Sequence, residues 1–265
     1  MIHKTLSIER KDHVTIVIFN TPERSNALSI EMMNEICDFS SRLNEDEQTR
    51  VVIFTGAGKH FCTGIDLTDE LRAQHYETDS RLMKIRHMKI GPEMIRRIHE
   101  IDQITIAAIN GTALGGGACI ASACDFRIGE QNCRVGYPEV NLAMNLSWVA
   151  LPLLVHLVGP AKAKQMVILA KRETAKNLIK WGFLDEIIED GKLLEKAKSM
   201  AQEYANQAPM AAQMVKRSVN AISSALDRAI MHMDSDQLLY SISGNDFQEG
   251  VQAFFEKRKP DFKGN

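Results

Sequence analysis

The stretch from Ile106 to Cys119 constrains the fold more than any other part of this 265-residue chain. A short β-branched apolar run ends at the turn pair Asn110-Gly111, three glycines follow at 115–117, and a small apolar run of helical character then begins. A strand, a glycine-rich bend and a helix start leave main-chain N–H groups free at the positive end of a helix dipole. The three glycines alone are equally consistent with a tight strand-to-helix turn that has no functional role. The rest of the chain is needed to choose between the two interpretations.

Buried strands and an amphipathic helix precede this stretch and predict an α/β fold. Val14–Phe19 and Val51–Thr55 are apolar at nearly every position, as in strands that are buried on both faces. A helical stripe from Ile30 to Leu43 lies between them, with Ser29 as its N-cap. A helix that joins two such strands indicates a parallel crossover. Further strands are expected at 5–10, 125–128, 134–137 and 183–188.

The remaining segments are expected to be loops and helices. Residues 59–66 are interpreted as a loop, and the charged segment 67–104 as two helices with a bend or a new start at Gly91-Pro92. From Ser147 onward the pattern is helical, with Trp148 on the apolar face. Ala208-Pro209 is the best boundary, which predicts a core at 1–207 and a helical region at 208–265 that ends in a short helix at 250–257.

Composition and charge exclude several classes of protein. The net charge of −2, from 32 basic and 34 acidic residues, provides no field for nucleic acid or an anionic membrane, and no apolar run approaches membrane-spanning length. Five cysteines without a C-x-x-C pair or zinc spacing favour neither disulfides nor a metal site, and a reducing compartment fits best. With neither a secretory signal nor a peroxisomal address recognised, a cytoplasmic protein is expected.

Two glycine-containing loops are candidates for shared chemistry. One runs from Phe61 to Asp66, and the other is the triplet at 115–117. If the fold brings them together, the N–H groups of Ile65 and Gly116 can point at one oxygen and form an oxyanion hole, worth roughly 3–4 kcal/mol per donor. From spacing alone, two unrelated loops are the simpler alternative.

Single titratable residues give weaker signals. Glu139 follows Pro138 at a strand end, where a buried carboxylate could remove a proton α to a thioester carbonyl, although a surface glutamate is the more common case. No histidine has metal spacing with another, so solvated or core histidines are expected at 60, 75, 87 and 99. Cys119, on a first helical turn without a histidine partner, is interpreted as a packing residue rather than a nucleophile.

Several motifs in order along the chain resemble the crotonase family, also called the enoyl-CoA hydratase/isomerase superfamily. The blocks that carry the resemblance cover almost the whole chain: residues 20–28, 61–67, 110–117, 124–128, 136–139, 181–187 and 254–262. The resemblance implies a spiral of ββα units followed by a C-terminal helical trimerisation region, with a homotrimer or a hexamer built as a dimer of trimers.

The resemblance also implies an acyl-CoA thioester substrate and no cofactor beyond its CoA moiety. Ile65 and Gly116 would donate N–H bonds to the thioester oxygen and stabilise an enolate. The positions where this family lays its CoA are Arg24, Ala27, Thr63, Asp66 and Leu67. Phe254 and Lys257 match tail positions that can reach CoA from a neighbouring subunit. Met83, Met88 and Met94 are candidates for lining the acyl pocket.

One departure from the family pattern bears on the reaction. Hydratases of this family carry two glutamates; the second matches Glu139, but the first position is Cys119 here. One carboxylate can move a proton between C2 and C4, so the resemblance implies a 3-enoyl-CoA to 2-enoyl-CoA isomerase with Glu139 as the catalytic acid/base. The alternatives are a 2-enoyl-CoA hydratase or hydratase/lyase, in which Cys119 or water covers the missing role, and a catalytically silent CoA-binding member.

Overall fold

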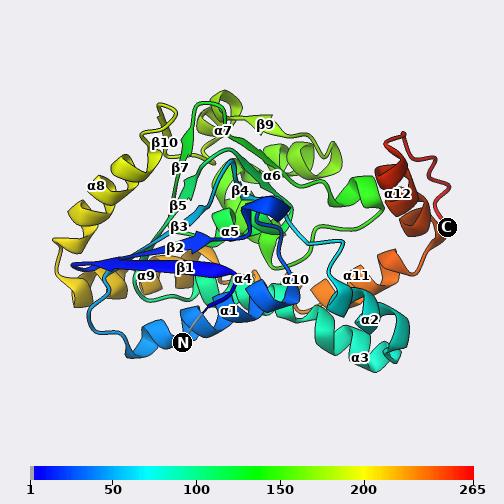
Figure 1. Ribbon diagram of the computed structural model, residues 1–265, viewed down its shortest axis with the longest axis horizontal. Coiled ribbons are helices and arrows are strands. Elements are labelled where there is room, and N and C mark those ends of the chain that lie inside the picture. Colours follow the sequence, from blue (N-terminus) through cyan, green and yellow to red (C-terminus); the bar gives the residue numbers. More distant parts are fainter. Residues whose placement is uncertain (1–2) are drawn as a thin grey trace.

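The computed structural model describes residues 3–265, apart from the side chain of Arg228, and contains a six-stranded and a four-stranded sheet with helices around them (Figure 1). The six-stranded sheet has the order β1 (Leu6–Lys11), β2 (Val14–Phe19), β3 (Val51–Gly56), β5 (Ile104–Ile109), β7 (Phe126–Glu130), β10 (Glu186–Ile188). The second sheet has the order β4 (His60–Cys62), β6 (Thr112–Leu114), β8 (Arg134–Gly136), β9 (Glu173–Thr174). Only β1 and β9 run antiparallel to their neighbours.

The chain forms a spiral in which each turn gives one strand to each sheet. The pairs β3/β4, β5/β6 and β7/β8 follow one another, and helices carry the chain back to the next turn. Two buried or half-buried carboxamides join successive turns. Asn26 donates to the carbonyls of Ala57 and His60, and Asn110 both accepts from the Gly56 N–H and donates to the Gly56 carbonyl. The predicted α/β spiral of two strands and a helix per turn is therefore confirmed.

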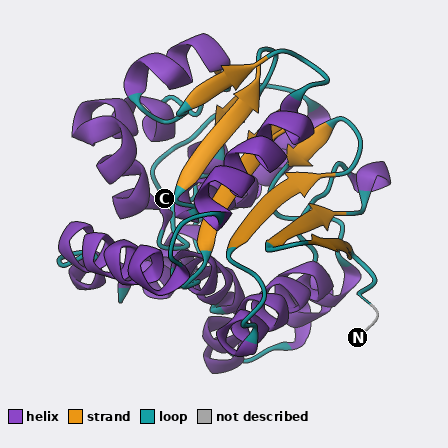
Figure 2. Ribbon diagram, turned by 90° about the vertical axis from the view of Figure 1, so that its left-hand side faces the viewer, coloured by secondary structure: helices purple, strands orange, loops and turns teal. Residues whose placement is uncertain are grey.

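Helices cover both faces of the larger sheet, as Figure 2 shows. Those that precede the last strand are α1 (Ile30–Arg42), α2 (Glu70–Thr78), α3 (Arg81–Met88), α4 (Ile90–His99), α5 (Gly116–Ala123), α6 (Ala150–Ile168) and α7 (Ala175–Trp181). The main core forms where α1, α4, α5 and α6 pack against the sheets. On the opposite face, α8 (Leu193–Ala205) buries a row of alanines against the central strands.

The last helices are α9 (Pro209–Ser223), α10 (Arg228–Met231), α11 (Asp234–Ile242) and α12 (Asn245–Glu256). A buried lysine joins α9 to the core, because Lys216 donates to the Gln103 carbonyl at 2.8 Å and pairs with Asp125 at 2.7 Å. The boundary at 207/208 stays a prediction. Within the described range, none of the helices combines the length and the apolar character that a membrane crossing demands.

Three local predictions were wrong. The segment 59–66 contains the short strand β4, which pairs with β6. The segment 67–104 forms three helices, because Asp69 and Ser80 each cap a new helix; Gly91-Pro92 lies in the first turn of the third. Trp148 precedes its helix, which begins at Ala150, and both Trp148 and Val149 have left-handed backbone conformations.

Candidate active site

A cavity of about 950 Å³ opens where the two glycine loops, η3 (the 3-10 turn Glu139–Leu142), α2, α3 and α12 meet. Nine of the ten predicted catalytic and CoA-binding residues line it: Ala27, Thr63, Ile65, Asp66, Leu67, Gly116, Glu139, Phe254 and Lys257. These residues come from positions up to 230 apart in the sequence, so the fold gathers them into one site.

The first loop is held so that the Ile65 N–H faces away from its neighbouring chain. The Leu28 N–H donates to the Gly64 carbonyl at 2.7 Å, and the Asp66 N–H donates to the Leu28 carbonyl at 3.1 Å. Leu28 and Ile65 form a parallel bridge in which Leu28 bonds to the residues before and after Ile65, and not to Ile65 itself. The Ile65 N–H therefore points away from Leu28. Gly64 has φ +93, a conformation that a side chain rarely adopts.

The second loop lies against the first. The Gly115 N–H donates to the Gly136 carbonyl at 3.0 Å, and Gly116 begins α5, where an N–H has no acceptor within the helix. A Cβ built on Gly64 would lie 3.5 Å from the Gly116 nitrogen. The fold thus brings the two loops together, with unused N–H groups on Ile65 and Gly116 at the wall of one cavity. This is the arrangement that an oxyanion hole requires.

Glu139 begins η3 directly beside the glycine loop. A Cβ built on Gly115 would lie 3.2 Å from Glu139 Oε1. Burial raises the pKa of the Glu139 carboxyl to about 7, with only its own main-chain N–H opposing the shift. Its Oε2 is shielded from solvent and has no hydrogen-bond partner among residues 3–265. A carboxyl with this pKa can both accept and return a proton near neutral pH.

Cys119 lines the same cavity on the first turn of α5. Burial, with a further contribution from the Glu139 carboxylate, raises the pKa of its thiol well above the usual value. The side chain is therefore a neutral thiol and not a nucleophile. The two carboxylates among the described cavity-lining residues differ: Asp66 is engaged by Arg24 and Thr68, whereas Glu139 has a free oxygen.

Arg24 is not among the cavity-lining residues, and its expected contact with CoA stays a prediction. Its Nη1 donates to Asp66 Oδ2 at 3.0 Å, and the guanidinium holds the loop aspartate in place. Although burial opposes it, hydrogen bonds from Thr68 and Arg24 hold the pKa of Asp66 below its usual range. Of the three predicted methionines, Met88 lines the cavity, whereas Met83 does not and Met94 is buried in the core under α4.

Trp148, which the sequence places on the apolar face of a helix, packs its indole ring beside the glycine loop. A Cβ on Gly116 would lie 2.6 Å from Trp148 Cζ3, and a Cβ on Gly91 would lie 2.1 Å from Trp148 Cε2. The left-handed turn that places the ring is held by Asp234 Oδ2, which accepts from the Val149 N–H at 2.6 Å. The ring therefore backs the first turn of α5 and lines the cavity.

The C-terminal tail folds over the cavity of its own chain. A Cβ on Gly250 of α12 would lie 2.8 Å from Leu142 Cα, so α12 packs directly on η3. Phe254 and Lys257 reach the cavity from there. Their expected contact with the CoA of a neighbouring subunit stays a prediction.

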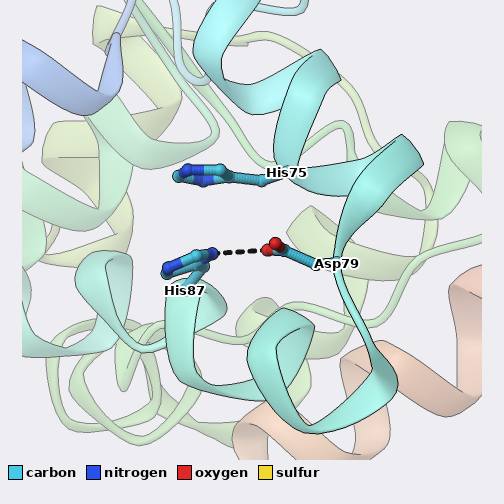
Figure 3. A group of neighbouring side chains, drawn as sticks. All are labelled: His75, Asp79 and His87. Atoms are coloured by element: carbon cyan, nitrogen blue, oxygen red, sulfur yellow. Dashed lines mark hydrogen bonds and ion pairs between the residues drawn. The ribbon is translucent and has the colours of Figure 1, made fainter.

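Sequence reasoning missed three polar residues on the cavity wall formed by α2 and α3: Arg72, His75 and His87. The histidines were treated as unrelated, but their rings stack with centroids 3.9 Å apart, and His87 Nδ1 lies 2.6 Å from Asp79 Oδ2 (Figure 3). One ring nitrogen of each histidine and a carboxylate oxygen of Asp79 lie within 4.8 Å of one another, a grouping that could hold a metal ion. The i, i+3 spacing of Arg72 and His75 is the signal that could have revealed this wall.

A family model for enoyl-CoA hydratase/isomerase matches residues 9–265, and the chain belongs to this family, whose members act on acyl-CoA thioesters. A putative enoyl-CoA hydratase of Thermus thermophilus is 33% identical over 95% of this chain and 98% of that protein. The solved carnitinyl-CoA hydratase of Mycobacterium avium is 28% identical, covers 99% of both chains and superposes with a TM-score of 0.86.

A solved monofunctional enoyl-CoA isomerase of Mycobacterium smegmatis is also similar, with 26% identity, a TM-score of 0.70 and coverage of 83% of this chain and 94% of that one. Two of these three proteins carry the name hydratase and one the name isomerase. The comparisons therefore define the family and leave the choice of reaction to the residues of the site.

Proposed function

We propose that this protein converts 3-enoyl-CoA to 2-enoyl-CoA, with Glu139 as the only acid/base. One observation carries the proposal: among the described residues that line the cavity, Glu139 offers the one carboxylate with a free oxygen, and a neutral thiol occupies the position of a second acid. Moving a double bond needs one group that takes a proton and returns it. Adding water needs a second group to activate the water.

The proposed mechanism follows from the geometry. The thioester oxygen would bind between the N–H groups of Ile65 and Gly116, which stabilise the negative charge that develops when a C2 proton leaves. Glu139 accepts that proton and, as a neutral acid, delivers it to C4 of the dienolate. The double bond then lies between C2 and C3, conjugated with the thioester. A carboxyl with a pKa near 7 suits both halves of this transfer.

We propose further that CoA lies along the cavity wall formed by Ala27, Thr63, Asp66 and Leu67, near the tail residues Phe254 and Lys257. Arg24 acts indirectly, by fixing Asp66.

A homotrimer or hexamer is also proposed. It is supported by an exposed apolar row on and after α9, which includes Met210, Val215, Ile222 and Leu226. Light scattering on the purified chain tests the assembly, and a monomer at micromolar concentration would contradict it.

The second candidate reaction is hydration of a 2-enoyl-CoA, favoured by the hydratase names among the relatives. Turnover of a matched pair, trans-3-hexenoyl-CoA and trans-2-hexenoyl-CoA, separates the two reactions. Isomerisation raises the absorbance of the conjugated thioester and hydration lowers it. Faster hydration than isomerisation would overturn the proposal, and binding of CoA without turnover of either substrate would indicate a silent member.

A variant at Cys119 sharpens this test, because Cys119 lines the cavity and a longer side chain can extend into it. Cys119→Glu supplies a second carboxylate, and we expect it to raise hydration of the 2-enoyl substrate at least about tenfold. Cys119→Gln is the matched control, since it adds the same bulk without the charge. Equal hydration by both variants would show that the missing acid is not what limits water addition.

A further inference from the structure

The guanidinium of Arg72 lies at the cavity wall without a partner. Its Nε and Nη2 are shielded from solvent and make no hydrogen bond within the described part of the chain. A buried guanidinium without a counter-ion costs free energy, since it gives up its hydration and receives nothing in return. An unpaired arginine at the wall of a binding cavity indicates that the missing partner belongs to a ligand.

The acids nearest Arg72 are already engaged elsewhere. Asp66 accepts from Thr68 and Arg24. Asp69 accepts from the main-chain N–H groups of Ile30 and Leu71, at 2.7 and 3.0 Å, and so caps α2. Neither carboxylate forms an ion pair with the Arg72 guanidinium, although both contribute to its electrostatic surroundings.

A second nitrogen without a partner lies one helical turn further along α2. His75 Nδ1 is shielded and has no hydrogen-bond partner in residues 3–265, and His75 also lines the cavity. Its ring is held by the stack on His87, which in turn is fixed by Asp79 (Figure 3). Residues three apart lie on one face of a helix, so Arg72 and His75 present their nitrogens from the same side of α2.

We infer that this corner of the cavity binds a carboxylate carried by the acyl chain, so that the preferred substrates are acyl-CoA thioesters with a second, anionic carboxyl group. The flat guanidinium fork matches the two oxygens of a carboxylate, and His75 can complete its hydrogen bonding. This inference rests on the acyl-CoA function proposed above. A phosphate of CoA offers the same anionic chemistry, and the experiment separates the two sources.

Calorimetry with unreactive thioethers tests the inference without catalysis. The probes are S-alkyl-CoA and S-(ω-carboxyalkyl)-CoA compounds of matched chain length in a series of lengths, and CoA itself. We expect the wild type to bind one carboxyalkyl probe at least tenfold more tightly than its alkyl match. Arg72→Met should remove that preference, weakening the carboxyalkyl probe about 10- to 100-fold and leaving the alkyl probe unchanged.

Arg81→Met is the matched control, because Arg81 is exposed at the start of α3, does not line the cavity and carries the same charge. It should keep the wild-type preference. Arg72→Met should melt no lower than the wild type, since it removes an unpaired charge, whereas a structural role would lower its melting temperature.

Three results would overturn the inference. They are no preference in the wild type at any length, an equal loss of affinity for all three kinds of probe in Arg72→Met, and loss of the preference in Arg81→Met. The second result would assign Arg72 to a CoA phosphate. Failure to bind even CoA would overturn the acyl-CoA function as well, whereas CoA binding without isomerisation would leave this inference standing and remove only the proposed reaction.

Discussion

The glycine loops and the α2–α3 wall enclose the same cavity but are built in opposite ways. Every residue of α5, which begins in the second loop, is buried, and main-chain hydrogen bonds hold the first loop to Leu28 and the second to Gly136. In α2 and α3 no residue is fully buried. Two short helices with capping residues at Asp69 and Ser80, and few apolar contacts below them, form this side of the site.

This difference separates two tasks. Stabilising charge on a thioester oxygen demands N–H groups fixed to within a few tenths of an ångström, which tightly packed backbone provides. Choosing among acyl chains demands side chains that can change without disturbing the core, and an exposed helical wall allows that. We therefore propose that the loops set the reaction and that the α2–α3 wall selects the substrate.

The largest effect on the reaction is expected when the first glycine loop is disturbed. Gly64→Ala places a Cβ 2.9 Å from the Leu114 carbonyl oxygen at φ +93, so the loops must separate and the Ile65 and Gly116 donors move apart. We expect kcat for the 3-enoyl substrate to fall by about 10²–10³. Gly191→Ala is the control: its φ is +84 but nothing lies within 4 Å, so it should cost about 1–2 kcal/mol of stability and leave kcat unchanged. Equal effects on kcat would contradict the account.

Glu139 should lower stability at high pH, because the folded state raises its pKa from 4.5 to about 7. The favourable contribution of the protonated form is complete below pH 4.5 and is lost as the pH rises through 7. Glu139→Gln should therefore be more stable than the wild type by about 3 kcal/mol at pH 8 and by less than about 1 kcal/mol at pH 5. Urea denaturation at both pH values measures this, and a pH-independent difference would refute the buried carboxyl.

The same pKa sets the pH dependence of the reaction. The carboxylate is the form that accepts the C2 proton, so kcat/KM should fall about tenfold per pH unit below pH 7 and level off above it. Between pH 8 and pH 5.5 the expected loss is about 30-fold. Initial rates with the 3-enoyl substrate give the profile. A midpoint near 4.5 would show that Glu139 is solvated during turnover.

The smallest effect is expected at the wall. Met88 lines the cavity from α3, and Met88→Ala should favour longer acyl chains over shorter ones by about tenfold in relative kcat/KM. Leu82→Ala is the control on the same helix, since Leu82 is 57% exposed and off the cavity, and it should change neither selectivity nor stability. A shift in both variants would mean that α3 acts through general loosening and not through contact.

Much of the fold could be predicted from the sequence, because the buried strands and α1 have strong apolar periodicity and clear caps. The order of the motif blocks along the chain then predicted the spiral. The short strand β4 was missed because three residues give no periodicity, and its pairing with β6 is a tertiary contact. The break between α2 and α3 was missed although Ser80 is a good N-cap, since the surrounding residues lack an apolar stripe.

The parts of the site that main-chain groups form were predicted from the sequence, whereas the wall that side chains of α2 and α3 form was missed. Ile65, Gly116 and Glu139 follow from loop motifs, and the structure brings them to one cavity. Arg24 turns toward Asp66 and not toward the cavity. That choice depends on tertiary packing, which no local sequence pattern encodes. That two nitrogens of Arg72 are shielded and unpaired is likewise a property of the assembled fold. From the sequence alone, a charged residue on a polar helix is expected to be solvated.

The central claim is that a single carboxyl, Glu139, moves a proton between C2 and C4 of a bound 3-enoyl-CoA. The most direct measurement follows the absorbance of the conjugated thioester after the wild type or Glu139→Gln is mixed with trans-3-hexenoyl-CoA. The account predicts a steady rise with the wild type and a rate at least about 10³-fold lower with Glu139→Gln, at unchanged CoA affinity. No rise with the wild type, or an equal rate with the variant, would contradict it.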